Sequence, residues 1–217
     1  VVNGTYTVLL SATELFLTPS YEALINYSAD NIHVLLGSAG ATEARTVVSE
    51  DACASCHVEV QGHSGVREGL DACLVCHTAG TEDLYSATDA GTTPGVTVNF
   101  PVLMHKLHGS GGLSEALVVN GYPANPYAEG YPNYNVHTWS DLAFPRFDGG
   151  VTACEACHGS SAAWKDPQAV ACLACHDTTD AAAHAAVNTD DELGESCDVC
   201  HGEGREFSVE AMHDWLR

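Results

Sequence analysis

The chain has 217 residues, and its 29 acidic residues outnumber its 7 basic residues to give a formal net charge of −22. So acidic a surface excludes nucleic acid as a partner, because binding to nucleic-acid phosphates depends on Lys and Arg. The length allows one or two domains, and no stretch of the sequence has the pattern of a membrane span.

Residues 1–48 contain no cysteine and are rich in β-branched and apolar residues. The segments GTYTVLL, LINYS and NIHVLLG alternate in part between apolar and polar residues, which predicts strands. His33 lies in the third segment and is predicted to be structural. We therefore expect a short β segment, followed by a linker at SAGATEA.

The sequence pattern then changes, because the motif Cys-x-x-Cys-His occurs five times and uses all ten cysteines. The cysteines are Cys53, Cys56, Cys73, Cys76, Cys154, Cys157, Cys172, Cys175, Cys197 and Cys200. The histidines that close the five copies are His57, His77, His158, His176 and His201.

Three chemical frameworks compete to explain this repeat. Disulfide scaffolds do not usually place cysteines in pairs of one fixed spacing, each followed by histidine. A zinc histidine usually lies several residues from its cysteine pair, where the ring can turn onto the metal. Covalent haem accounts for the whole pattern, since the two thiols form thioethers with the porphyrin and the next histidine binds the iron. The sequence therefore predicts five covalently bound c-type haems, with the five motif histidines as proximal ligands.

Seven further histidines are available for the second face of each iron. Five of them are predicted distal ligands: His63, His105, His108, His184 and His213. Methionine is the other common sixth ligand, but it occurs only at Met104 and Met212, each directly before a candidate histidine. Neighbouring residues on a helix point about 100° apart and cannot both face one iron, so we expect these methionines to fill the core.

The sequence around the distal candidates predicts where most of them lie. His105 and His108 have the i, i+3 spacing that puts two rings on one side of a helix, where they can serve two adjacent haems. His213 lies on the apolar stripe of a C-terminal helix. His184 lies in an Ala-rich turn.

His63 lies between two haem anchors, in QGHSGVR, where glycines let the backbone come close to a flat macrocycle. The short path from His57 to His63 spans at most roughly 20 Å. We therefore expect a neighbouring haem, rather than the haem of His57, to be its target. His137, in YNVHTWSDLAFP, either hydrogen-bonds a haem propionate or replaces one of the five distal ligands.

Five haems would replace much of an ordinary aliphatic core and fix the chain through covalent and iron bonds. The predicted fold is a mostly α and irregular multihaem cytochrome c module with little regular secondary structure, preceded by the short β segment. The predicted domains are the β segment at 1–48 and a pentahaem module at 49–217. YPANPYAEGYPNYN, between the second and third motifs, is predicted to be a surface loop.

Lys106 and Lys165 are the only lysines in the chain. An acid-rich surface with so little lysine suits a saline habitat or the binding of divalent cations. Asp190, Asp191 and Glu192 form a candidate calcium site, although their spacing is not that of an EF-hand.

The spacers between the motifs carry a resemblance as well. RTVVSEDACASCH, HSGVR, CLVCHTAGTED, FPVLMHKLHG, FPRFDGGVTACEACH, CLACHD and CDVCHG follow one another in this order. Over about residues 45–217 the chain resembles one pentahaem module of the outer-surface multihaem c-type cytochromes of the OmcA/MtrC type. The resemblance implies the same five distal ligands, and it implies that residues 1–48 correspond to the end of a β domain. Such cytochromes usually have two modules and two β domains, whereas this chain has one module and part of a β domain.

The predicted function is electron transfer through five bis-histidine haems by an exported carrier, because haem c is attached outside the cytoplasm. The expected location is extracellular or on the outer cell surface. Expected partners are other multihaem cytochromes, copies of the same chain joined end to end as a filament, and extracellular electron acceptors. The alternative is a reductase of nitrite, hydroxylamine or a sulfur oxyanion. A reductase would need one open iron, whereas the chain has surplus histidines and no C-x-x-C-K motif.

Overall fold

A computed structural model of the chain describes residues 4–17, 23–36, 47–63, 65, 67–83, 96–120, 136–142 and 150–214. The chain forms two compact units. The first comprises Val1–Thr78 and Glu155–Ser161, and the second comprises Ala79–Cys154 and Ala162–Arg217. The predicted linker at SAGATEA and the predicted loop YPANPYAEGYPNYN lie outside the described residues.

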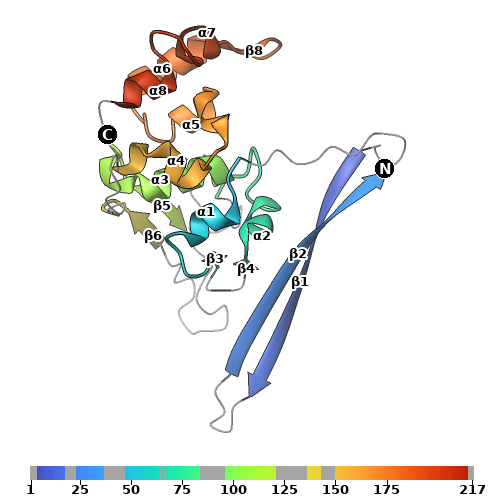
Figure 1. The fold of residues 1–217 in the computed structure, drawn as a ribbon. Coiled ribbons are helices and arrows are strands. Elements are labelled where there is room, and N and C mark those ends of the chain that lie inside the picture. The colour runs from blue at the N-terminus through green and yellow to red at the C-terminus, as the bar shows by residue number, and fades with distance from the viewer. Residues whose placement is uncertain are drawn as a thin grey trace, which may run out of the picture. The chain divides into compact units, whose positions relative to one another are not determined.

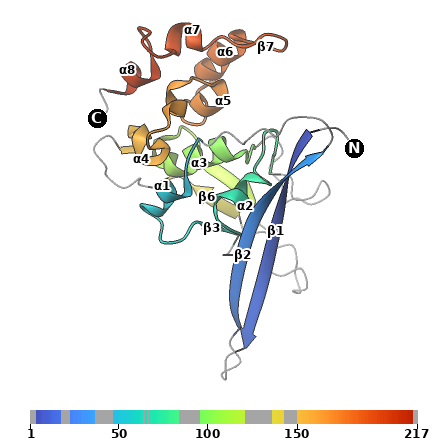
Figure 2. The ribbon, with the colours of Figure 1, turned by 45° about the vertical axis from the view of Figure 1, so that its right-hand side comes forward.

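The first unit begins with a β-hairpin. β1 (Gly4–Leu17) and β2 (Ala23–Leu36) pair antiparallel over all 14 residues of each strand. Figures 1 and 2 show the pair as a long twisted ribbon, with the twist that L-residues impose on strands. The predicted strand segments fall in this hairpin, where LINYS and NIHVLLG (apart from Gly37) belong to one strand. Both strands lie within the predicted β segment at 1–48, and each, at 14 residues, is longer than the sequence segments that predicted it.

The rest of the first unit consists of short elements around the first two motifs. They are α1 (Glu50–Ala54), β3 (Gln61–Gly62), β4 (Arg67–Glu68) and α2 (Leu70–Leu74). Ser49 caps α1, because its side-chain oxygen accepts a hydrogen bond from the Ala52 amide. The strands β3 and β4 pair as a small hairpin, and His63 lies in the connection between them.

The second unit is built from short helices and two further strand pairs. Its first elements are α3 (Phe100–His108), η1 (Ser110–Gly112), β5 (Leu117–Asn120), β6 (Val136–Trp139) and η2 (Gly150–Thr152). α4 (Cys154–His158) follows at the boundary between the units, and η3 (Ala162–Lys165), α5 (Ala169–Cys172) and α6 (Thr179–Val187) come next. The last elements are β7 (Thr189–Asp190), β8 (Gly194–Glu195), α7 (Asp198–His201) and α8 (Val209–His213).

The helices predicted for His105, His108 and His213 are confirmed by α3 and α8. The prediction of a turn around His184 was wrong, since α6 is a nine-residue helix. Thr178 caps α6 by accepting a hydrogen bond from the Ala181 amide, and the alanines that follow have the highest helix propensity.

The described residues contain only a small aliphatic core. Their buried hydrophobic residues are Ala72, Val102, Leu117 and Ala174. This core is small for a chain of this size, because such chains normally bury well over half of their surface on folding. The eight described α-helices have at most nine residues, and six of the eight strands have two to four. This agrees with the predicted mostly helical and irregular fold with little regular secondary structure.

Candidate functional site

Each Cys-x-x-Cys-His motif forms one helical turn. In four motifs the histidine amide donates to the carbonyl of the first cysteine, with N–O distances of 2.8–2.9 Å. The remaining motif makes up the whole of α4. Residues three and four apart lie on one face of a helix, so the local fold gathers both thiols and the imidazole of a motif on the same side.

The ten cysteines all lie in the described part of the chain, and none of them is disulfide-bonded. Burial raises the pKa of six thiols, those of Cys53, Cys73, Cys157, Cys172, Cys175 and Cys197. These surroundings favour the neutral thiol, whereas reactive and metal-binding cysteines are usually surrounded by groups that stabilise the thiolate. The described residues also contain no group of three or more His, Cys, Asp or Glu that could hold a metal ion by itself.

Three motif histidines each face a second histidine from elsewhere in the chain. The ring centres of His63 and His77 lie 6.0 Å apart in the first unit. In the second unit, the ring centres are 6.1 Å apart for His176 and His213 and 6.1 Å apart for His184 and His201. All three second histidines are predicted distal ligands.

These separations fit one metal between two imidazoles. A ring nitrogen binds a metal at about 2.0–2.1 Å and lies about 1.1 Å from its own ring centre, so two rings on opposite sides of one metal have centres about 6 Å apart. The ring planes of the three pairs differ by 30°, 57° and 86°. Each bound ring can rotate about its own metal–nitrogen bond, so such a range is compatible with ligation.

Backbone carbonyls fix the orientation of several candidate rings. The Nδ1 atoms of His108, His201 and His213 lie 2.7–2.8 Å from the carbonyl oxygens of Met104, Phe207 and Val209. A carbonyl oxygen only accepts, so Nδ1 carries the proton and Nε2 keeps the lone pair. Metal-binding histidines typically donate their second N–H to such a partner. The nitrogen that keeps the lone pair in each ring is therefore Nε2, the atom that would bind a haem iron.

The conformation and electrostatics of His63 set it apart. Its φ of 53° is in the left-handed region, which non-glycine residues seldom adopt and which tends to occur at functional sites. Burial lowers the pKa of His63, and His77 and Arg67 lower it further. The imidazole is thus favoured in the neutral form that binds metals.

The remaining predicted ligands belong to different units. His105 and His108 lie one turn apart on α3 in the second unit, and both are half-buried. His57 and His158 belong to the first unit. Burial lowers the pKa of His158, and the hydrogen bond between its Nδ1 and the Val47 carbonyl, at 3.3 Å, partly opposes that shift.

Apolar side chains near the motifs are left in solvent. Val58, which follows His57, is 99% exposed, and Val199, inside the fifth motif, is 62% exposed. Leu74, inside the second motif, is also exposed. A large flat apolar group bound at the motifs would cover such side chains and recover the hydrophobic stabilisation that the small core lacks.

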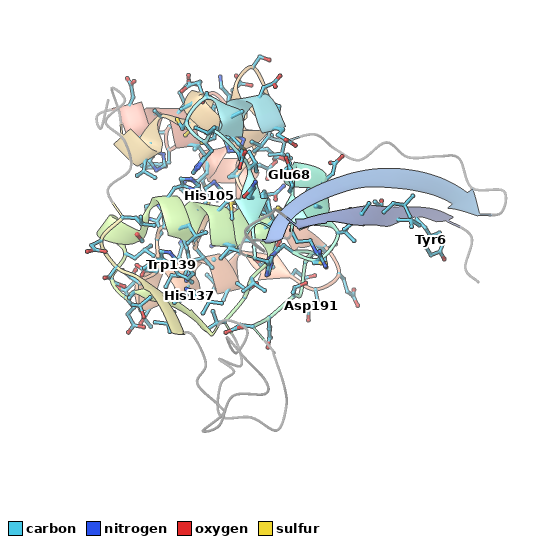
Figure 3. The ribbon with its side chains drawn as sticks, turned by 90° about the horizontal axis from the view of Figure 1, so that it is seen from below. Tyr6, Glu68, His105, His137, Trp139 and Asp191 are labelled. Carbon is cyan, nitrogen blue, oxygen red and sulfur yellow. The ribbon has the colours of Figure 1, made fainter. Side chains whose placement is uncertain are left out.

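The other residues that the sequence singled out have different surroundings. His137 and Trp139 lie close together on β6 (Figure 3), with ring centres 5.6 Å apart and ring planes 19° apart. Among the predicted calcium ligands, Asp190 accepts hydrogen bonds from the amides of Glu192 and Leu193 and so stabilises the turn between β7 and β8. The side chain of His33 lies outside the described structure.

Carboxylates that the sequence analysis missed connect the motif helices. Glu50 of α1 accepts a hydrogen bond from the Leu70 amide at 3.0 Å, at the start of α2. Glu195 accepts from the Ala169 amide at 2.8 Å, at the start of α5. In both places the carboxylate comes from the segment of a neighbouring motif and satisfies a backbone donor at a helix N-terminus. No local pattern shows these contacts, because the partners are 20 and 26 residues apart.

Paired imidazoles next to paired thiols form the ligand set of a c-type cytochrome, and a comparison with protein families agrees with that class. The family model described as outer membrane cytochrome MtrC/MtrF-like, domains II/IV, matches residues 45–214. The chain therefore belongs to this cytochrome family, and the resemblance to the MtrC type of module is confirmed. A comparison with curated proteins gave no match.

Proposed function

We propose that the chain is an electron-transfer module with five covalently bound c-type haems, each held by two cysteines and two histidines. The observation that carries this proposal is the separation of about 6 Å in three histidine pairs, each of which includes a motif histidine. In this proposal residues 49–217 form the haem-binding module and residues 1–48 form the β segment that precedes it.

The same distances suggest which histidines share a haem. His63 pairs with His77, His213 with His176, and His184 with His201. His105 and His108 are the two remaining proposed distal ligands, and His57 and His158 are the two remaining proximal ligands. His137, which lies next to Trp139, is left out of the ligand set.

In this arrangement the protein tunes electron transfer rather than binding a substrate. Bound haem supplies one-electron exchange at its iron. Two imidazoles per iron leave no open position, and the carbonyls bonded to Nδ1 make the rings stronger donors. A net charge of −22 favours the oxidised state, so we expect low reduction potentials.

A haem count and a spectrum test the proposal together. A pyridine haemochrome assay combined with intact mass should give five haems per chain, and the oxidised spectrum should be entirely low-spin. Four or fewer haems, or bound zinc, would contradict the ligand set. A high-spin band in the unmodified protein would instead favour the reductase of nitrite, hydroxylamine or a sulfur oxyanion, which needs an open iron.

We place the protein outside the cell or on its outer surface. The family to which it belongs is named for outer membrane cytochromes, and in the described segments no helix is long and apolar enough to cross a membrane. Its proposed partners are other multihaem cytochromes and extracellular electron acceptors. Protease treatment of intact cells tests this location, since a surface protein would be digested while periplasmic markers survive.

The β1–β2 hairpin supports a further part of the proposal, in which copies of the chain join end to end as a filament. Among the described strands, β1 and β2 pair only with each other, and β2 also contacts α2 and β4. Neither strand contains Lys or Pro, two residues that often protect an edge from further pairing, and their charged residues are Glu14 in β1 and Asp30 in β2. A two-stranded hairpin is also marginally stable by itself, so a second copy would stabilise it.

Electron microscopy of the native secreted protein tests the filament. Filaments with continuous haem-to-haem contact between subunits would support it. A protein that stays monodisperse in solution at high concentration would contradict the filament without affecting the electron-transfer proposal.

A further inference from the structure

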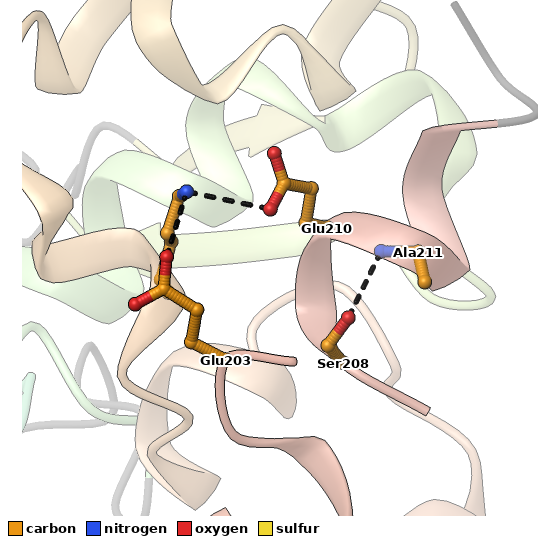
Figure 4. Close-up of polar contacts among 5 residues, drawn as sticks. Glu203, Ser208, Glu210 and Ala211 are labelled. Carbon is orange, nitrogen blue, oxygen red and sulfur yellow. Dashed lines mark hydrogen bonds and ion pairs between the residues drawn. The ribbon is translucent and has the colours of Figure 1, made fainter. Parts of the chain in front are cut away.

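One of the two lysines binds two carboxylates at once. Lys165, at the end of η3, has its Nζ 3.2 Å from Glu203 Oε1 and 3.3 Å from Glu210 Oε2 (Figure 4). Its ammonium group also lies 5.4 Å from the centre of the Trp164 ring. The hydrogen bonds that Lys165 donates to Glu203 and to Glu210 raise its pKa, so this lysine stays charged.

Both carboxylates belong to one stretch of chain, residues 203–210, which connects two proposed haem ligands. Glu203 comes two residues after His201, and Glu210 lies on α8 three residues before His213. The 203–210 segment also supplies both carbonyls that orient these rings. The carbonyl of Phe207 accepts from His201 Nδ1 at 2.8 Å, and the carbonyl of Val209 accepts from His213 Nδ1 at 2.7 Å.

The helix that carries His213 has little stability of its own. α8 has five residues, which is well below the length at which an isolated helix is stable in water. Ser208 caps it by accepting a hydrogen bond from the Ala211 amide at 3.3 Å (Figure 4). Any further restraint on α8 has to come from contacts with other elements, and η3 is an element that it contacts.

We propose that Lys165 is a positioning residue that holds the 203–210 segment in place and thereby keeps His201 and His213 in ligand geometry for two different haems. The inference rests on the proposed function, in which these histidines bind haem iron. A single exposed ion pair stabilises little. Here, however, the same cation also removes the repulsion between two carboxylates in a chain that has few other cations.

Substitution of Lys165 by methionine tests the proposal, because methionine keeps most of the side-chain length and removes the charge. In the reduced protein, carbon monoxide must displace a distal histidine before it binds. With Lys165→Met, we expect carbon monoxide to bind about 3- to 10-fold faster at one haem, the haem of His176 and His213. The amides of Ala211 and Met212 should exchange hydrogen faster by a similar factor.

Matched variants separate positioning from a general effect of charge. Lys165→Arg keeps the cation and should behave like the unmodified protein. Arg205→Gln removes one positive charge from an exposed side chain of the same segment and should leave carbon monoxide binding unchanged. Lys165→Glu alone should make carbon monoxide bind faster, and adding the exchange Glu210→Lys should reverse most of that increase.

A ligand variant distinguishes failure of this inference from failure of the proposed function. His213→Ala should convert one haem to the high-spin state while four stay low-spin. If it does so and Lys165→Met binds carbon monoxide at the unmodified rate, the positioning role is wrong and the ligand set stands. If His213→Ala leaves the spectrum unchanged, the proposed ligand set is wrong. Should Lys165→Met not accumulate, Glu210→Leu removes one of the two carboxylates that Lys165 contacts, and an unchanged rate there also overturns the inference.

Discussion

At the scale of single residues, the backbone decides which nitrogen of a histidine is available. The carbonyls that accept from Nδ1 of His108, His201 and His213 leave the lone pair of each ring on Nε2. For His108 and His213 the acceptor lies four residues earlier, at the same helical spacing. A histidine near the end of a short helix can thus be oriented by that helix alone, without help from another side chain.

His63 provides the sharpest test of a single ligand. Glycine adopts its φ of 53° without strain, so His63→Gly should remove the imidazole and leave the backbone in place. We expect one haem, that of Cys73 and Cys76, to become high-spin while four stay low-spin. Added imidazole should restore the low-spin spectrum.

The matched control for this experiment is His137→Phe. Phenylalanine keeps an aromatic ring next to Trp139, so all five haems should remain low-spin. A high-spin haem in His137→Phe together with an unchanged spectrum in His63→Gly would show that the two histidines have exchanged roles.

The sequence could predict the arrangement of site residues only where they lie within a few positions of one another along the chain. The i, i+3 and i+4 spacing of a Cys-x-x-Cys-His motif fits one helical turn, and the same reasoning predicted the helix of His105 and His108. The pairing of His63 with His77, or the acceptance of a hydrogen bond by the Phe207 carbonyl, depends on how loops fold back. Short-range periodicity carries no information about such contacts.

At the scale of elements, short helices are stabilised by side chains from other segments. α2 begins at Leu70, and its N-cap residue Gly69 has no side chain to cap it, so Glu50 of α1 accepts a hydrogen bond from the Leu70 amide instead. This contact connects the helices of the first two motifs, so it restrains their separation. Glu195 does the same for α5.

Glu50→Ala should loosen the start of α2. The Leu70 amide should exchange hydrogen about 5-fold faster, as expected for loss of a cap that contributes about 1 kcal/mol. Glu50→Gln is the control, because its amide oxygen can still accept the hydrogen bond. Equal exchange rates in all three proteins would mean that the contact does not stabilise α2.

The hairpin can be tested separately from the haem sites. Tyr6, Val8 and Leu10 are exposed and alternate along β1, so they lie on one face. Leu10→Lys places a charge on that face and should prevent filaments while the haem count and spectrum stay the same. Val187→Lys, at a site 81% exposed outside the hairpin, should leave assembly intact. Filaments that form normally with Leu10→Lys would assign the contact to another surface.

At the scale of the whole molecule, charge is the dominant feature. The formal charge of −22 omits the propionates that five haems would add, so carboxylates far outnumber cations. Like charges within about 10 Å repel one another at moderate ionic strength, and this repulsion lowers the free energy of unfolding. The ion pairs of Lys165 with Glu203 and Glu210 oppose this repulsion.

We therefore expect the melting temperature to rise with added sodium chloride, by about 2–4 °C for each 1 kcal/mol of repulsion that is screened.

Calcium compared with sodium at equal ionic strength tests the candidate site at Asp190, Asp191 and Glu192. Asp190 already stabilises a turn, so its carboxylate is held in place, whereas no described hydrogen bond fixes the other two carboxylates. If calcium binds there, it will stabilise the protein beyond the effect of sodium, as linkage requires for any ligand of the folded state. The excess will disappear in Asp191→Asn with Glu192→Gln. If calcium and sodium have equal effects, only screening acts. A melting temperature that does not change with either salt would mean that the haem bonds, and not the surface charge, set the stability of the fold.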